Sequence, residues 1–557
     1  MMPSRGFQSS VDYNLHFGLG EISKIDSIKV IWPNKLSSII NNPPIDTLLS
    51  INYESEENVK ENTENVFLNE KSKQYFQQVH NAFKPHEEDN HVDFYYEGLI
   101  MRMLSKEGPA IEVVDLNNDG LDDVIIGGAV GQTTTVNYQQ INGQFKSIEI
   151  NDFENEVTAI HAFDANKDGL LDIYFGYGGN HKTQANGGFH DKLFIQNTSR
   201  NFELQPNAIP ETGFNTAVAL SFDYDDDGDL DLFVGSRSVP QDYGISPKSF
   251  LLENDGAGNF KDMTIRRAKD LDGLGMITDA EVIDIDQNGN QNLILSGEWM
   301  GIEIFEIAGK QLRRLDNPLQ KFRGWWNALQ IGDLNNDGLP DLVLGNRGDN
   351  FYFSASDEMP VKLWLEDFDS NGDKDKVLSR TIEGNDMPIQ QKGEMISQLP
   401  FLKKQSLKYK DYGTKSMEDL FGSEKINDAS FKSVNTFQTV VMLNKGNGEF
   451  KKANLPVEAQ FSAIHAIEIM DLNQDGNPDL ILAGNESDFK PQYGKLDAND
   501  GLVLFGDGKG TFNIVDEYKS LGLHGNVRSL NPLKIQKQEH LLIGINNDNP
   551  VLFKIRK

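Results

Sequence analysis

A nine-residue acidic segment recurs seven times along the 557-residue chain. The first copy reads DLNNDGLDD, and apolar runs precede and follow it (IEVV and VIIGG). The intervals between successive copies are 49, 59, 61, 49, 34 and 104 residues, and four of them lie near the length of one β-propeller blade. The copies begin at Asp115, Asp164, Asp223, Asp284, Asp333, Asp367 and Asp471.

The order of residue types inside the segment indicates a cation-binding loop. Positions 1, 3 and 5 carry Asp or Asn, position 6 is Gly, and position 9 is Asp in six copies. Alternate side chains of a tightly curled loop direct their oxygens to one centre, and Ca²⁺ takes 6–8 oxygen ligands in irregular geometry. Gly at position 6 suits the sharp turn, and the variable position 7 would offer its backbone carbonyl. Mg²⁺ fits less well because it requires near-ideal octahedral geometry.

We therefore expect Ca²⁺ at about five to seven sites. The predicted metal ligands are Asp115, Asn117, Asp119, Leu121, Asp123, Asp164, Asn166, Asp168, Leu170, Asp172, Asp223, Asp225, Asp227, Asp229, Asp231, Asp284, Asp286, Asn288, Asp333, Asn335, Asp337, Leu339, Asp341, Asp367, Asp369, Asn371, Asp373, Asp375, Asp471, Asn473, Asp475, Asn477 and Asp479.

Two other interpretations of the loops compete with this one. Helix–loop–helix calcium sites need Glu at position 12, and that position is apolar in every copy, from Ile126 in the first to Leu482 in the last. Simple Asp/Asn/Gly turns remain an alternative, above all for the Asp284 loop, which has Asn288 at position 5 and Asn292 at position 9. The apolar flanks predict that each loop joins two strands of a β-hairpin.

A second hairpin usually follows the first, as in KSFLLENDGAGNFKDMTI, so each unit has four strands. This pattern predicts a β-propeller. Seven blades are favoured, with the Asp367 loop in outer strands or an insertion of the fifth; eight result if that loop has its own blade. The last unit lacks a fourth strand, and VDFYYEG (Val92–Gly98) is a candidate to supply it and close the ring.

These residues also carry a family resemblance. D-x-N-x-D-G-x-x-D followed by LxLG resembles the FG-GAP repeats of integrin α-subunit propellers and the VCBS repeats of bacterial surface proteins. RGFQSS, LHFGLG and DSIKVIWPNK near the N-terminus resemble the ASPIC/UnbV domain, which accompanies such repeats in cartilage acidic protein and in exported bacterial proteins of the Bacteroidetes type. In that family the ASPIC/UnbV segment follows an earlier propeller and a signal peptide. This chain starts inside that segment, so we expect a truncated or split version of the architecture.

The expected organisation has three parts. Residues 1–53 form a small ASPIC/UnbV-like β domain, with strands in DSIKVIWP and DTLLSINYE and a buried Trp32. Residues 54–90 are charged and form a linker. Residues 91–557 form the propeller, with an insertion at about 380–435 whose sequence loses the strand pattern and resembles helix.

Composition limits the partners. The formal net charge is −33, which argues against nucleic acid and anionic membranes as partners. The chain has no Cys, so disulfides and thiolate metal sites are excluded. No apolar run approaches 18 residues, so no membrane insertion is expected. The N-terminal residues lack the pattern of a signal peptide.

The expected function is a non-catalytic, calcium-binding interaction or adhesion protein of the cell surface or exterior, which presents a protein- or glycan-binding propeller face. No catalytic motif of a known type appears, and a polysaccharide-acting hydrolase or lyase on the same scaffold is the alternative. The tripeptide RGD at Arg347–Asp349 is more simply a polar turn than an adhesive motif. Trp325 and Trp326 more often pack a strand than stack on a sugar.

Overall fold

The computed structural model describes residues 4–6, 9–10, 15–20, 22–31, 36–51, 60–61, 75–515 and 520–556. The chain divides into two compact units, Met1–Asn69 and Glu70–Lys557. In the part of the chain that the structure describes, no helix is long and apolar enough to cross a membrane.

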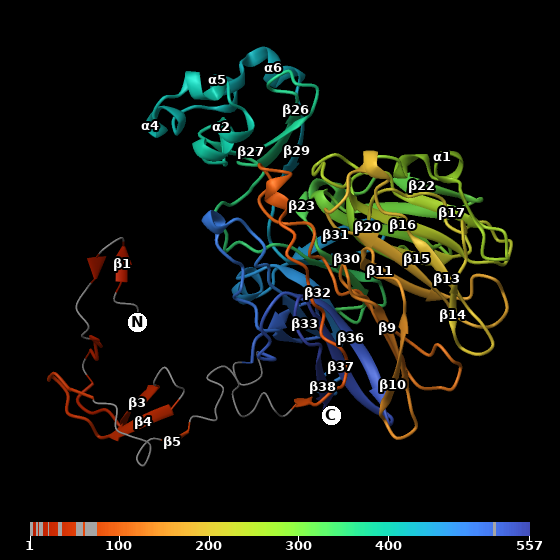
Figure 1. Ribbon diagram of the computed structural model, residues 1–557. Coiled ribbons are helices and arrows are strands. Elements are labelled where there is room, and N and C mark those ends of the chain that lie inside the picture. Colours follow the sequence, from red (N-terminus) through yellow and green to blue (C-terminus); the bar gives the residue numbers. More distant parts are fainter. Residues whose placement is uncertain are drawn as a thin grey trace. The chain divides into compact units, whose positions relative to one another are not determined.

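The N-terminal unit contains short antiparallel strands, drawn red in Figure 1. Its strands are β1 (Ser4–Gly6), β2 (Ser9–Ser10), β3 (Ser27–Ile31), β4 (Leu36–Asn41) and β5 (Lys60–Glu61). Strand β3 confirms the strand predicted in DSIKVIWP, and it pairs with β4 from Ser27↔Asn41 to Ile31↔Ser37. The strand predicted in DTLLSINYE was wrong over its described residues, 46–51, which form no strand. Trp32 lies outside the described residues.

The second unit is a β-propeller of seven four-stranded antiparallel sheets, each a blade. Blades one to four run outward in chain order: β7 (Ile111–Val114), β8 (Asp123–Ile126), β9 (Thr134–Gln139), β10 (Phe145–Ile150); β11 (Glu156–Phe163), β12 (Asp172–Gly178), β13 (Lys192–Gln196), β14 (Phe202–Leu204); β15 (Asn215–Phe222), β16 (Asp231–Ser238), β17 (Phe250–Asn254), β18 (Phe260–Asp262); β19 (Met276–Ile283), β20 (Asn292–Met300), β21 (Glu303–Ala308), β22 (Gln311–Leu315). A short strand, β23 (Gly324–Trp325), also pairs with β20, and helix α1 (Thr264–Arg267) follows β18.

The fifth blade is interrupted in the chain and the seventh is completed by an early strand. The fifth consists of β24 (Ala328–Gly332), β25 (Asp341–Gly345), β30 (Val440–Asn444) and β31 (Phe450–Ala453), and the sixth of β32 (Ile464–Met470), β33 (Asp479–Gly484), β34 (Leu502–Gly506) and β35 (Phe512–Asn513). The seventh consists of β36 (Val527–Ile535), β37 (Gln538–Ile545), β38 (Val551–Ile555) and β6 (Phe76–Val79).

The second strand of each blade has an apolar central run, and both of its faces are buried there. In β16, Phe233 packs toward the fourth blade, while Leu232 and Val234 pack toward the second. Alternate residues of one strand therefore enter two different cores, as the side-chain period of two requires. Seven hydrophobic clusters result, one at each interface between neighbouring blades, including the interface between the seventh and the first.

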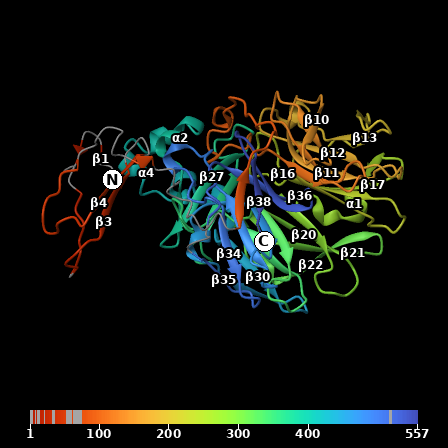
Figure 2. The same ribbon diagram turned by 90° about the horizontal axis from the view of Figure 1, so that it is seen from below.

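The innermost strands contact one another in a closed cycle, in the order β7, β11, β15, β19, β24, β32, β36 and back to β7. The seventh blade is completed by β6, which pairs antiparallel with β38 from Phe76↔Ile555 to Val79↔Leu552 and lies beside it in Figure 2. The prediction that an early segment closes the ring is confirmed, but the segment predicted, Val92–Gly98, was wrong. That segment contains only a short 3₁₀ turn, Asp93–Tyr95, and β6 lies in the stretch assigned to the linker.

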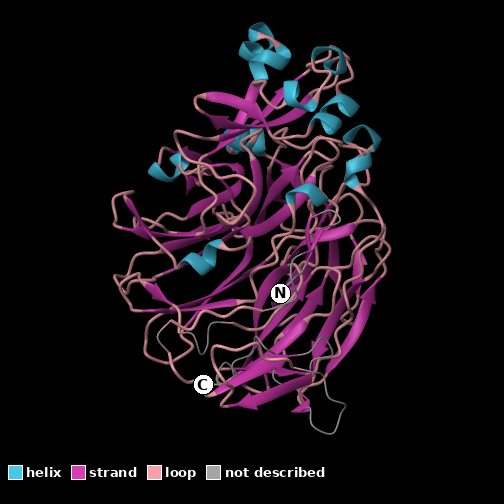
Figure 3. Cartoon of the chain, turned by 90° about the vertical axis from the view of Figure 1, so that its left-hand side faces the viewer, coloured by secondary structure: helices cyan, strands magenta, loops and turns pink. Residues whose placement is uncertain are grey.

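The fifth blade carries a large insertion between β25 and β30. It contains a further sheet, in the order β28-β27-β26-β29, made of β26 (Val361–Glu366), β27 (Asp375–Ile382), β28 (Asn385–Pro388) and β29 (Ser430–Val434). Five short helices complete it: α2 (Lys392–Gln398), α3 (Leu402–Gln405), α4 (Tyr409–Tyr412), α5 (Met417–Phe421) and α6 (Ser423–Asp428). The helices pack on a core that includes Trp364, Phe368 and, from outside the insertion, Leu99. Most helices of the chain lie together at the top of the view in Figure 3.

Candidate functional site: the Asp-rich loops

All seven acidic segments form the same turn. Six of them join the first and second strands of blades one to six, and the Asp367 segment joins β26 to β27 in the insertion. The residue at position 4 has positive φ in every copy, from 55° at Asn118 to 63° at Ser370. Gly at position 6 also has positive φ, 81° at Gly120, and a Cβ there would meet no atom within 4 Å. Backbone conformation rather than crowding therefore requires glycine at this position.

Asp at position 1 holds the turn closed through two backbone hydrogen bonds. In all seven loops, the N–H of Gly at position 6 donates to its Oδ2 at 2.8–2.9 Å. The N–H at position 5 donates to its Oδ1 at 3.0–3.2 Å. Each carboxylate oxygen can accept about two hydrogen bonds or ligands, so both oxygens can still face a cation.

The residue at position 9 is buried and ties the loop to its sheet. It accepts the N–H of position 2 at 2.9–3.2 Å in all seven loops. In five loops its other oxygen accepts, at 2.7–2.9 Å, the N–H of the last residue of the blade's third strand. Burial raises the pKa of Asp123 and Asp231 to about 7, against hydrogen bonds that lower it. Position 9 is thus a structural brace as well as a predicted ligand.

The side chain that ends the third strand links neighbouring blades. Asn254 Nδ2 donates to the carbonyl at position 2 of the preceding blade's loop, Ala165, at 2.8 Å. The amides of Gln196 and Asn444 make the equivalent bonds to Leu116 and Ile285 at 3.2 and 2.8 Å. Sequence reasoning missed this role, although Gln or Asn at the end of the third strand is visible in the repeats. The six propeller loops form a rim at one end of the ring, and these bonds join the first blade to the second, the second to the third and the fourth to the fifth.

The Asp223 and Asp367 loops bring carboxylates together most closely. One oxygen from each of Asp223, Asp225 and Asp227 lies within 4.8 Å of the others, and the same holds for Asp367, Asp369 and Asp375. The other five loops form no such carboxylate group among the described residues; four of them have Asn at position 3, and the Asp284 loop has Asn at positions 5 and 9. The loop carboxylates also pair with lysines across blades, as in Lys167 Nζ to Asp229 Oδ2 at 3.5 Å.

Several buried ligand atoms in the loops have no hydrogen-bond partner. Asn117 Oδ1, at position 3, and Asp225 Oδ1 and Asp229 Oδ1, at positions 3 and 7, are all buried and without a partner. A buried polar atom without a partner costs about 1–3 kcal/mol, so these oxygens indicate a missing ligand. The donor set is oxygen only, which suits a hard cation. The residues present therefore fit Ca²⁺.

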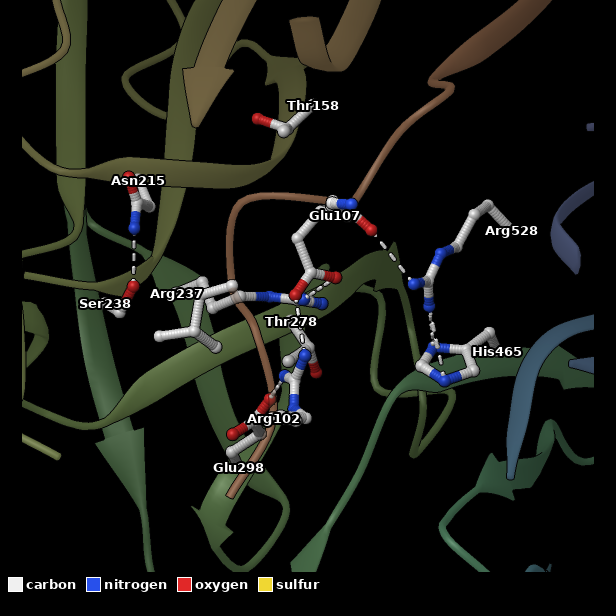
Figure 4. Close-up of polar contacts among 12 residues, drawn as sticks. Arg102, Glu107, Thr158, Asn215, Arg237, Ser238, Thr278, Glu298, His465 and Arg528 are labelled. Carbon is white, nitrogen blue, oxygen red and sulfur yellow. Dashed lines mark hydrogen bonds and ion pairs between the residues drawn. The ribbon is translucent and has the colours of Figure 1, made fainter. Parts of the chain in front are cut away.

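The opposite ends of the strands hold a buried ion cluster on the inner side of the ring (Figure 4). Arg102 lies between three carboxylates: Nη1 is 2.7 Å from Glu107, Nη2 contacts Glu298, and Nε is 3.2 Å from Glu486. Arg237 pairs with Glu107, and Arg528 lies beside His465. Sequence reasoning missed this cluster. Its signal is a charged residue within two positions of the glycine near the end of the second strand, at Arg237, Glu298, Arg347 and Glu486.

Arg347, the first residue of the RGD tripeptide, belongs to the same region. It is 5 % exposed, and its guanidinium lies 3.9 Å from the ring centroid of Trp325. The tripeptide is therefore not presented as an accessible unit. Trp325 and Trp326 are buried as well, and Trp326 Nε1 donates to the carbonyl of Met300 at 3.0 Å. Both tryptophans pack the blades.

Three glutamates on innermost strands, Glu112, Glu281 and Glu468, predict an unusual pH dependence. Burial raises the pKa of each to about 7. Because the folded pKa exceeds the ordinary value of 4.5, this contribution to stability is complete below about pH 4.5 and is lost as pH rises through about 7. We expect the melting temperature in chelator to fall between pH 5 and pH 8. Glu281→Gln should flatten that profile, and a profile unchanged by this substitution would contradict the assignment.

Two family models match the chain. The model for ASPIC and UnbV matches residues 1–58, and that for the FG-GAP-like repeat matches residues 115–175, which hold the first two acidic loops. The chain thus carries an ASPIC/UnbV segment and an FG-GAP-like repeat. A search of the curated proteins finds no match.

Among solved structures, the FG-GAP-repeat protein is similar to BBS1N in complex with ARL6DN, soaked with mercury, at 11% identity and a TM-score of 0.36, with 82% of this chain and 94% of that chain covered. It is also similar to the V. cholerae biofilm matrix protein Bap1, at 10% identity and a TM-score of 0.32, covering 87% and 91%. These scores are too low to carry an argument. The propeller assignment rests on the chain's own sheets and repeats.

Proposed function

We propose that this FG-GAP-repeat protein is a calcium-stabilised interaction protein without catalytic activity, which acts at the cell surface or outside the cell. The observation that carries the proposal is the set of buried loop oxygens without partners, at Asn117, Asp225 and Asp229. The Asp-rich loops would hold the cation through positions 1, 3 and 5 and the carbonyl at position 7. Bound Ca²⁺ supplies positive charge among crowded carboxylates and so holds the hairpin rim rigid.

The proposed location follows from the expected affinity. Exposed loops of this kind suit extracellular calcium modules, whose dissociation constants are about 10⁻⁴–10⁻³ M. At millimolar Ca²⁺ each site would then add roughly 0.4–1.4 kcal/mol to the free energy of unfolding. Five to seven sites together would add several kcal/mol, whereas cytosolic Ca²⁺ would leave most of them empty. A propeller made rigid in this way is suited to present a face to a protein or glycan.

The test is thermal unfolding in excess chelator and in millimolar Ca²⁺, with bound calcium counted by mass spectrometry after gel filtration. We expect a higher melting temperature with Ca²⁺ and about five to seven ions per chain. Asp223→Asn should remove about one ion. Asp255→Asn is the matched control, because Asp255 makes the same kind of turn hydrogen bonds in an outer hairpin that lacks the acidic pattern. No bound calcium and no shift would overturn the proposal.

A further inference from the structure

A second group of ligand-type side chains lies away from the Asp-rich loops. His86 and Glu88 belong to the segment between β6 and β7, and Glu156 is the first residue of β11 in the second blade. One nitrogen of His86 and one oxygen from each glutamate lie within 4.8 Å of one another. The side chains of His86 and Glu88 are 0% and 3% exposed, and Glu156 is fully buried. Two distant chain segments therefore meet at one buried polar point.

The surroundings hold these side chains in place. Asn546, just after β37, donates from Nδ2 to Glu88 Oε1 at 2.6 Å, and the N–H of Gly108 donates to Glu156 Oε1 at 2.6 Å. The N–H of His86 donates to the carbonyl of Asp548 at 3.0 Å. The segment between β6 and β7, which we call the closing segment, is thus fixed to both the seventh and the second blade at this point.

Two atoms of the group lack partners. His86 Nε2 and Glu156 Oε2 are buried and have no hydrogen bond. A Cβ at Gly108 would lie 2.8 Å from both His86 Nε2 and Glu156 Oε1, the oxygen that accepts the Gly108 N–H, so the imidazole and this carboxyl group approach the same small space, which only glycine leaves open. A buried imidazole nitrogen and a buried carboxylate oxygen without partners, on two side chains this close, indicate a ligand that both can bind.

The charges favour a cation as that ligand. Two adjacent buried carboxylates cannot both be ionised without compensation. Lys106 and Arg528 are the positive side chains that act electrostatically on Glu88, and Glu107 adds further negative charge at Glu156. A neutral imidazole beside two carboxylates is a donor set that binds a metal ion.

We propose that His86, Glu88 and Glu156 bind a divalent transition-metal ion of the Zn²⁺ class at the closure of the ring. Imidazole with two carboxylates is a donor set that Zn²⁺ accepts, whereas Ca²⁺ and Mg²⁺ take oxygen ligands alone. The ion joins the closing segment to the second blade, and Asn546 connects its Glu88 ligand to the seventh. The site is independent of the calcium loops, which lie at the other ends of the blade strands.

The test counts zinc in the full-length protein, produced in zinc-supplemented medium and purified in millimolar Ca²⁺ so that the Asp-rich loops do not take up zinc. We expect about one Zn²⁺ per chain after gel filtration. Glu156→Gln and His86→Gln should lower that content at least tenfold. Glu87→Gln is the matched control, because Glu87 is an exposed neighbour in the same segment, and it should keep the full content. Fewer than about 0.1 Zn²⁺ per wild-type chain would overturn the proposal.

A second measurement keeps the proposal falsifiable if the variants do not fold. The zinc-edge X-ray absorption spectrum of the wild-type protein should show one imidazole nitrogen together with carboxylate oxygens. A shell with several imidazoles, or with oxygen only, would place the zinc elsewhere and refute the site. Folded variants that retain the wild-type zinc content would refute it equally.

Discussion

Replacing Arg102 with Met is expected to lower the free energy of unfolding by about 3–5 kcal/mol, which is the usual cost of removing one partner from a buried ion cluster. Arg102 is 5 % exposed and faces Glu107, Glu298 and Glu486. Burial alone would lower the pKa of Arg102, but these carboxylates hold it above its ordinary value. Without the guanidinium, the inner end of the ring retains buried negative charge that water cannot reach.

Chemical unfolding in urea, followed by tryptophan fluorescence, measures this loss. Trp299 reports on the same region, since its Nε1 donates at 2.8 Å to Tyr243, whose hydroxyl donates to Glu298. Arg313→Met is the control: its side chain is 68% exposed, and its ion pair with Glu306 spans 3.6 Å. That substitution should cost less than about 0.5 kcal/mol. A loss below 1 kcal/mol for Arg102→Met would mean that the cluster is not essential to the ring.

The repeats predicted most of the fold because each blade contains its own signal. Each acidic loop joins two apolar runs and a second hairpin usually follows, so a unit of four strands repeats; this led to the propeller, with seven blades favoured. The Asp367 loop was assigned to outer strands or an insertion of the fifth blade, or, with eight blades, to a blade of its own. The structure confirms seven blades and the insertion.

Ring closure could not be predicted correctly, because pairing of distant segments leaves no local pattern. Phe76–Val79 is a short strand within a charged stretch, and its partner β38 lies at the other end of the chain. The axial cluster was missed for a related reason. Arg102 lies outside the repeats, and a charged residue after a strand normally suggests exposure to solvent. Only the circular arrangement brings Arg102, Glu298 and Glu486 together.

The predicted ligand set can be separated by experiment into calcium ligands and structural braces. Asp341, at position 9, is fully buried and accepts the N–H groups of Leu334 and Asn444 at 2.9 and 2.7 Å. Asp341→Ala leaves both donors without an acceptor. We expect it to lower the free energy of unfolding by about 2–4 kcal/mol, in chelator and in Ca²⁺ alike.

Asp337, at position 5 of the same loop, is exposed; it accepts the N–H of Leu339 at 3.0 Å and lies 3.5 Å from Lys445 Nζ. Asp337→Ala should therefore change stability by less than about 1 kcal/mol in chelator, yet remove part of the stabilisation by Ca²⁺ and about one bound ion. Parallel urea titrations of the two variants, with and without Ca²⁺, distinguish the roles. If Asp341→Ala were harmless in chelator, the brace would be disproved; if Asp337→Ala left the calcium response intact, position 5 would not be a ligand. Since Asp occupies both positions in the Asp115, Asp164, Asp223 and Asp471 loops as well, the result for this pair would assign the roles in those loops too.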